Sequence, residues 1–192
     1  MQQKFLCHFC PGTQFIVGVR DLLGAPTDAI VNPANGGLTH GGGLAAEIAK
    51  EAGESMEQEC EVIIRERGHV PKTHAVLTGA GKLPYQYIIH AIGPRMGDGD
   101  EYRKLISTIQ NVMQLALDTK LTSVAFPAIS TGIYGVPKEI CAKAFLDAMN
   151  AFWDDESHRA VKLVWLCVTM DDYFIFKKVM NSDSQTCTLG LV

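Results

Sequence analysis

The stretch Asp28-Ala-Ile-Val-Asn-Pro-Ala-Asn35 is followed by Gly36-Gly-Leu-Thr39 and then by His40-Gly-Gly-Gly-Leu44. Residues 29–34 are an apolar run bounded by Asn and Pro, which is typical of a buried β-strand. Leu44, Ile48 and Ala52 share one face of a predicted helix over residues 44–52. A glycine-rich loop therefore connects a buried strand directly to a helix, and this connection is the repeating unit of an α/β fold.

On both sides of this unit, apolar patterns predict strands that alternate with helices. Strands are expected at residues 5–9, 14–19, 73–78, 87–92, 123–129 and 162–168, and helices at 55–67, 102–119, 138–152 and 173–180. Ser55 is expected to cap the second helix and Gly68 to end it. The alternation predicts a mostly parallel sheet covered by helices on both faces. No repeat or linker divides the chain, so we expect one domain over residues 1–181 and a polar C-terminal tail over 182–192.

The composition favours a single folded domain and limits its partners. The chain has 192 residues, of which 47% are hydrophobic and 20% charged, so it can bury a sizeable core. A formal net charge of −4 leaves no basic surplus to neutralise nucleic-acid phosphates, and nucleic acid is not an expected partner. We expect no signal peptide, and no apolar run approaches the ~18 residues that span a bilayer. We therefore expect no membrane partner and a cytoplasmic or nuclear location.

Six cysteines raise the question of a metal or redox site. Cys60, Cys141 and Cys167 lie in apolar helix or strand patterns, where a free cysteine behaves as a small hydrophobe. Only Cys7-His8-Phe9-Cys10 resembles a motif, and no second pair of ligands follows it. We favour a strand that carries two reduced thiols over a metal or redox site, and we expect neither a metal nor a cofactor.

Two glycine-rich loops are the strongest functional signal. One covers residues 35–43 and the other residues 130–135, and each connects a predicted strand to a predicted helix. Ligands of open α/β sheets bind at the carboxyl ends of strands, where the N–H groups of a helix N-terminus hold an anion. Glycine lets the backbone approach a phosphate closely. The loops therefore predict a clamp for a diphosphate, and tight turns that need glycine only for packing are the alternative interpretation.

The side chains beside these loops suit a nucleotide sugar without a familiar fingerprint. Neither G-x-G-x-x-G nor G-x-x-x-x-G-K-[ST] is present, which argues against a kinase, an NTPase or a dinucleotide oxidoreductase. Asn32 and Asn35 can bond a ribose hydroxyl, and Asp21 can accept from an exocyclic amine or be a solvated turn residue. His40 is a ligand contact, a general base or a polar loop residue. No pattern of nucleophile and base supports covalent catalysis.

Several separated blocks of the sequence resemble the macrodomain family. An Asp at position 21 precedes the matching blocks, which are residues 28–35, 40–44, 78–84, 89–94 and 126–135. The resemblance covers roughly residues 13–180, and segments 44–46 and 81–84 are most similar to the first macrodomain of multi-macrodomain ADP-ribosyltransferases. It implies a three-layer α/β/α fold with a mixed, mostly parallel central sheet that binds ADP-ribose.

The resemblance also implies roles for individual residues. Asp21 would accept a hydrogen bond from the adenine amine, Asn35 would bond the distal ribose, and Tyr134 would shield that ribose. Thr169 and Met170 occupy the region where the family often stacks a side chain on adenine, so the stacking partner is open. The predicted ligand-binding residues are Asp21, Leu22, Asn32, Asn35, Gly41, Gly42, Gly43, Leu44, Ser130, Thr131, Gly132, Ile133 and Tyr134. The predicted catalytic residues are Asn35, His40 and Gly42.

The activity implied by the resemblance turns on the residues after the glycine run. Ala45 and Ala46 stand where one branch of ADP-ribosyl hydrolases includes an aspartate that helps to activate water. Relatives with alanine there are still regarded as hydrolases. The resemblance implies a monomeric module, by itself or within a larger chain, that binds ADP-ribose and ADP-ribosylated proteins and hydrolyses the ADP-ribosyl ester on Asp or Glu. A non-catalytic reader of ADP-ribosylation is the alternative, and a nucleic-acid-binding macrodomain is disfavoured by the acidic charge.

Overall fold

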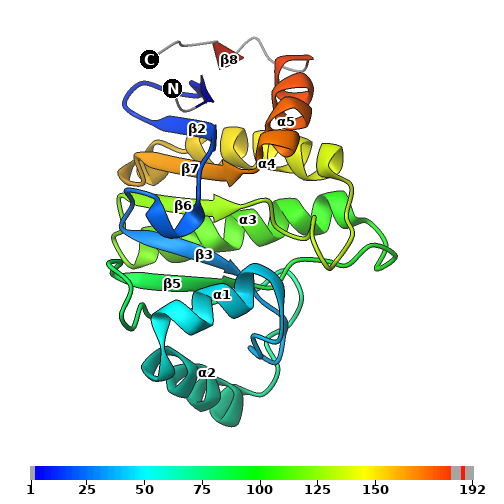
Figure 1. Ribbon diagram of the computed structural model, residues 1–192. Coiled ribbons are helices and arrows are strands. Elements are labelled where there is room, and N and C mark those ends of the chain that lie inside the picture. The colour runs from blue at the N-terminus through cyan, green and yellow to red at the C-terminus, as the bar shows by residue number, and fades with distance from the viewer. Residues whose placement is uncertain (1–2, 183–186, 189–192) are drawn as a thin grey trace.

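Eight strands form one sheet in the computed structural model, which describes residues 3–182 and 187–188 (Figure 1). The strands are β1 (Lys4–Cys7), β2 (Gln14–Val19), β3 (Ala29–Pro33), β4 (Ala75–Gly79), β5 (Tyr87–Ala91), β6 (Ser123–Pro127), β7 (Leu163–Val168) and β8 (Cys187–Thr188). The helices are α1 (Gly43–Ala52), α2 (Glu54–Arg67), α3 (Glu101–Asp118), α4 (Lys138–Asp154) and α5 (Met170–Ser182), with short 3-10 helices η1 (Leu22–Gly24) and η2 (Glu156–Ala160).

The sheet is mixed and mostly parallel, as predicted. The strand order is β4-β5-β3-β6-β7-β2-β1-β8. β5, β3, β6, β7 and β2 are parallel neighbours, whereas β4, β1 and β8 join antiparallel at the two sides. The five parallel strands therefore end at the same edge, which is where a ligand of an α/β protein binds.

Helices cover both faces of the sheet and give three layers (Figure 1). Helices α1 and α2 pack on one face with Ile30, Trp165 and Cys167, and α3, α4 and α5 pack on the other with Leu166 and Val164. Successive residues of a strand thus enter opposite halves of the core, as the two-residue period of a strand requires. Because both faces are buried, the central strands are continuously apolar.

One face of α3 is an apolar stripe that enters the core. Its members are all fully buried, and they are Leu105, Ile109, Val112, Met113 and Ala116. Helix α3 is therefore held against the sheet by the burial of this apolar face.

The starts of two helices were predicted wrongly, and in each case the local backbone or cap explains the difference. Helix α2 begins after Gly53 and not at Ser55, because the chain passes from α1 into α2 through Gly53 at a φ of +82° that favours glycine. Helix α5 begins at Met170, earlier than expected, since the Asp172 N–H donates to Thr169 Oγ1 at 3.2 Å. The predicted stop at Gly68 is confirmed by its φ of +73° and its N–H bond to Ile64 O.

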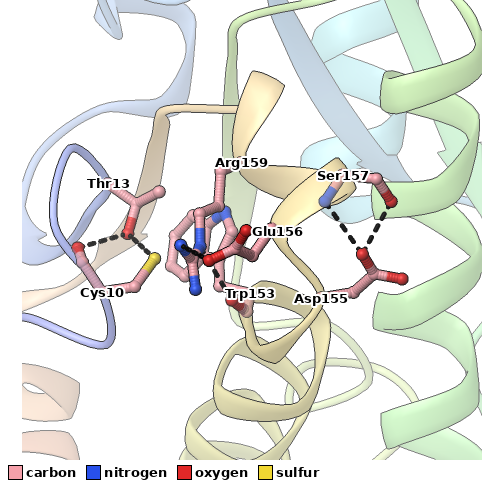
Figure 2. Close-up of polar contacts among 7 residues, drawn as sticks. All are labelled: Cys10, Thr13, Trp153, Asp155, Glu156, Ser157 and Arg159. Carbon is pink, nitrogen blue, oxygen red and sulfur yellow. Dashed lines mark hydrogen bonds and ion pairs between the residues drawn. The ribbon is translucent and has the colours of Figure 1, made fainter.

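The Cys-His-Phe-Cys segment forms the end of β1 and a tight turn. Cys10 Sγ lies 3.0 Å from Thr13 Oγ1, which in turn donates to Cys10 O at 3.1 Å (Figure 2). The turn packs on the end of α4, since the Phe9 and Trp153 ring centroids are 5.8 Å apart. Cys7 is buried and disulfide-bonded, and Cys10 is a free thiol. The expectation of a strand with two thiols was therefore wrong for Cys7.

The C-terminal segment is partly built into the sheet. Cys187 and Thr188 pair antiparallel with Cys7 and Leu6, so two residues of the predicted tail form β8. Residues 183–186 and 189–192 lie outside the described residues. In the described part of the chain, no helix combines the length and the apolar character that a membrane crossing needs.

Candidate functional site

A cleft of about 930 Å³ lies along the edge where the parallel strands end. The ends of β2, β3, β6 and β7 and the two glycine-rich loops form its walls. The predicted ligand-binding residues that line it are Asp21, Leu22, Asn35, Gly41, Gly42, Gly43, Leu44, Ser130, Thr131, Gly132, Ile133 and Tyr134. Asn32 and His40 are not among the lining residues.

The Asn35 side chain orders the first loop while it faces the cleft. Its Oδ1 accepts from the N–H groups of Gly37 and Thr39 at 3.1 and 3.2 Å, and its Nδ2 donates to Thr39 O at 2.5 Å. These bonds hold the amide in one orientation. A side chain fixed in this way is suited to orienting a ligand.

The start of α1 offers backbone donors to the cleft. Its N-cap is Gly42, which provides no side-chain hydrogen bond to the first turn. A Cβ on Gly41 would meet no atom within 4 Å, and one on Gly42 only Ile133 Cδ1 at 3.7 Å. Glycine is not needed at either position to avoid a clash, so the open space in front of the helix N-terminus is room for an anionic group.

Close packing against Gly93 holds the start of the second loop in place. Ser130 has a φ of +68°, and a Cβ on Gly93 would lie 2.2 Å from Ser130 Oγ. Gly93 is therefore required by packing, whereas Gly132 again faces open space. Within the two loops, the packing interpretation of glycine is correct for Gly36, where a Cβ would lie 2.7 Å from Val70 O.

Ile133 bridges the two loops across the cleft. Its side chain is 82% exposed, yet its Cδ1 is 3.4 Å from the Cβ position of Gly43. The exposed Ile133 side chain therefore reaches from the second loop to the start of α1. The two loops thus face each other, as the predicted clamp requires.

Asp21 lies at the opposite end of the cleft from the Asn35 loop. Its exposed carboxylate accepts from Leu23 N at 3.0 Å and thereby caps η1. The guanidinium of Arg20 lies 5.0 Å from the Trp165 ring centroid, and its Nη1 donates to Gly24 O. The turn that carries Asp21 is therefore held on both sides.

Sequence reasoning missed several lining residues. Arg95 lies 4.6 Å above the Tyr134 ring, and Asp172 forms an ion pair with Lys138. Arg95 follows the Ile89–Pro94 block directly, so a basic residue after a predicted strand was the available signal. Nothing local marks Asp172, because only the fold brings α5 beside the start of α4.

Cys167 also lines the cleft, but it is not a nucleophile at neutral pH. Burial raises the pKa of its thiol to about 12, although Arg20 acts in the opposite direction. The thiolate is the reactive form of cysteine, so this residue is a structural one.

The structure places His40 and Asn32 behind the first loop. Asn32 Nδ2 lies 3.3 Å from His40 Nδ1 and 3.0 Å from His90 Nδ1. Burial lowers the pKa of both histidines, that of His90 to about 3, so both rings are neutral at pH 7. Because His40 does not line the cleft, it does not lie where a general base would act on the ligand.

The fold and the cleft define an α/β protein that holds an anionic ligand at the ends of its strands. The Macro domain family matches residues 31–145, and the chain belongs to this family. The matched residues include the Val31-Asn32-Pro33-Ala34-Asn35 segment and both loops that suggested the family, whereas Asp21 lies before them.

Relatives of known and unknown activity span most of the chain. An uncharacterised protein of Sulfolobus acidocaldarius is 40% identical over 173 residues, which are 89% of this chain and 92% of its own. The O-acetyl-ADP-ribose deacetylase of Klebsiella pneumoniae is 35% identical over 164 residues, 84% of this chain and 93% of its own. Human protein mono-ADP-ribosyltransferase PARP14 is 38% identical over 144 residues, which are 73% of this chain but 8% of its own.

Solved macrodomains have the same fold. The Oceanobacillus iheyensis macrodomain with ADP superimposes with a TM-score of 0.87 at 27% identity, covering 95% of this chain and 97% of its own. The Trypanosoma brucei macrodomain in complex with ADP-ribose gives a TM-score of 0.76 at 27% identity, covering 86% and 68%.

Proposed function

We propose that this macrodomain binds ADP-ribose, with the diphosphate between the start of α1 and the loop over residues 130–135. The observation that carries the proposal is the convergence of two backbone loops, bridged by Ile133, on one cleft with open space before Gly41, Gly42 and Gly132. Backbone N–H groups bind a diphosphate without a basic surface, in keeping with the net charge of −4. The T. brucei relative was solved with this ligand.

The strand order supports an orientation of ADP-ribose with its adenine at Asp21 and its distal ribose at Asn35. Asp21 follows β2 and Asn35 follows β3, and β7 and β6 lie between these strands. Three inter-strand spacings of ~4.8 Å separate the two ends by about 14 Å. This span suits a base at Asp21, a diphosphate beside the loop after β6, and the distal ribose at Asn35.

We further infer that the domain hydrolyses the ester between mono-ADP-ribose and an Asp or Glu side chain. The Klebsiella relative is named for removal of another ester of ADP-ribose. Asn35 is held rigidly and can orient the distal ribose and a water molecule, which lowers the barrier without a covalent intermediate. Donors aimed at the diphosphate would add electrostatic stabilisation.

The absence of a base beside Asn35 predicts slow turnover. The cleft-lining residues from the Asn35 loop and the first turn of α1 carry no ionisable group, and they are Asn35, Thr39, Gly41, Gly42, Gly43, Leu44 and Ala45. The same observation favours the second candidate, a domain that binds ADP-ribosylated proteins and does not hydrolyse them.

A time course of released ADP-ribose separates the two candidates. The substrate is a transferase that carries labelled mono-ADP-ribose on glutamate, incubated with the protein, with Gly132→Glu protein or with buffer. We expect slow release with the unmodified protein alone. A trace equal to the buffer trace, from protein shown to bind ADP-ribose, would make the domain a reader.

A further inference from the structure

Behind the first loop, three metal-binding side chains from distant parts of the chain meet at one point. They are His40 from the loop before α1, Cys60 from α2 and His90 from β5, and their ligand atoms all lie within 4.8 Å of one another. His90 and Cys60 are 0% and 3% exposed, and His40 is half-buried. None of the three lines the ADP-ribose cleft.

The distances fit a tetrahedral metal ion. Cys60 Sγ lies 3.7 Å from His40 Nε2 and 3.7 Å from His90 Nε2. In a tetrahedral zinc site, Zn–S of about 2.3 Å and Zn–N of about 2.0 Å place sulfur and nitrogen about 3.5 Å apart. Two imidazoles and one thiolate are also the donor set that zinc prefers.

Asn32 supplies the support that metal-binding histidines need. Its amide group contacts Nδ1 of both histidines, at 3.3 and 3.0 Å, so each Nε2 faces other partners. These are Cys60 Sγ for His40, and Thr78 Oγ1 together with Cys60 Sγ for His90. Its Oδ1 is buried and has no hydrogen-bond partner in the described part of the chain. A half-turn of the amide would let Oδ1 accept from both Nδ1–H groups, which is the arrangement that makes Nε2 a ligand. Thr78 Oγ1 lies 2.9 Å from His90 Nε2, and a metal ion on Nε2 would take the place of this contact. The Thr78 hydroxyl would still donate to Gly79 O.

We propose that His40, Cys60 and His90 form a Zn²⁺ site that ties the first loop to α2 and β5, with water as the fourth ligand. The site is separate from the proposed reaction, and its test does not use ADP-ribose. The metal would replace the thiol proton of Cys60, so the N₂S set would carry a net charge of +1. Glu59 and Glu57 on α2 act electrostatically on Cys60 and bring a negative potential to this place.

Cobalt and calorimetry test the site directly. Full-length protein, freed of metal with a chelator, is titrated with Co²⁺ as a spectroscopic substitute and then with Zn²⁺. We expect a near-ultraviolet thiolate-to-cobalt band that Zn²⁺ removes. We also expect calorimetry to give about one Zn²⁺ bound per chain.

Matched variants locate the metal. Cys60→Ser should remove the cobalt band and weaken Zn²⁺ binding at least tenfold, and His40→Gln should weaken it while it preserves an amide near Asn32. Cys141→Ser, at another buried free cysteine, and Cys10→Ser, in the amino-terminal motif, should bind Zn²⁺ as the unmodified protein does. Thermal unfolding without metal checks that each variant is folded.

Two results would overturn the site. One is unmodified, folded protein that gives no thiolate-to-cobalt band at millimolar Co²⁺. The other is that the Cys60→Ser and His40→Gln variants bind Zn²⁺ with unchanged affinity, which would leave His40, Cys60 and His90 as a hydrogen-bonded network only.

Discussion

Asn35 and Asp21 show how a single side chain combines a structural and a ligand-binding task. Asn35 closes the turn to Thr39, and Asp21 caps η1, while both face the cleft. Substitution therefore changes local structure and ligand contacts together. A control that removes an equivalent structural contact elsewhere separates the two effects.

Asp21→Ala should weaken ADP-ribose binding by about 1–3 kcal/mol, the usual value for a hydrogen bond to a charged group. Calorimetry measures the affinity. Asp155→Ala is the matched control, because Asp155 caps η2 through Ser157 N as Asp21 caps η1 (Figure 2), and Asp155 does not line the cleft. Equal affinities for the two variants would show that Asp21 is only a turn residue.

Asn35→Ala should lower the rate of ester hydrolysis far more than the affinity for ADP-ribose. The reason is that orientation of ribose and water acts mainly on the transition state. Single-turnover release gives the rate, and calorimetry gives the affinity. Asn111→Ala, which removes another loop-holding amide at Thr73 O, should change neither. Equal losses of rate and affinity in Asn35→Ala would remove this mechanism and leave the activity to be explained otherwise.

At the scale of elements, the glycines of the two loops and of the neighbouring 89–94 block divide by what a Cβ would meet. Gly41, Gly42 and Gly132 face open space in the cleft, whereas Gly36 and Gly93 touch neighbouring backbone or side chains. The first group leaves room for a ligand and the second lets the elements pack. Sequence alone cannot separate them, because both occur in the same loops and blocks.

Gly132→Glu and Gly42→Glu should abolish ADP-ribose binding with little change in thermal stability. Neither glycine needs a positive φ, and the new carboxylate would occupy the anion position and repel the diphosphate. Gly24→Glu is the control, since Gly24 also faces open space but does not line the cleft. Binding retained in both loop variants would place the ligand elsewhere.

Gly93→Ala should instead lower the free energy of unfolding by about 1–3 kcal/mol, the usual cost of overpacking. Its Cβ would lie 2.2 Å from Ser130 Oγ and 2.8 Å from Ile129 Cγ2. Urea denaturation measures the change. The double variant Gly93→Ala with Ser130→Ala should recover part of the loss, and a double variant no more stable than Gly93→Ala would contradict the packing argument.

At the scale of the whole molecule, the sheet order sets the length of the site. The ends of β2 and β3 are brought to one edge with β6 and β7 between them, although Asp21 and Asn35 are close in sequence. A ligand must span the cleft to use both ends and both loops. Ligands of increasing length therefore test whether both ends of the cleft contribute to binding.

ADP-ribose should raise the unfolding temperature more than ADP, and ADP more than AMP, at equal concentration. A ligand that binds only the folded state at 100 times its Kd stabilises it by about 2.7 kcal/mol. Differential scanning fluorimetry measures the order. Identical shifts for ADP and ADP-ribose would mean that the Asn35 end contributes nothing to binding.

The sequence by itself determined the five helices, the strands other than β8, the layers and the two loops, because periodicity and glycine placement are local properties. It also placed Asp21, Asn35 and the 130–134 segment, through the macrodomain resemblance. Its errors at Ser55 and at the start of α5 arose where a backbone turn or a cap decides a boundary.

Tertiary structure alone decided which polar residues share a space. It turned His40 and Asn32 away from the cleft and brought His40 to Cys60 and His90, positions 20 and 50 residues further along the chain. It also added Arg95 and Asp172 to the cleft. The physical reason is that side-chain proximity across a parallel sheet depends on strand order, and strand order is set by how the helices pack on the sheet and not by local sequence.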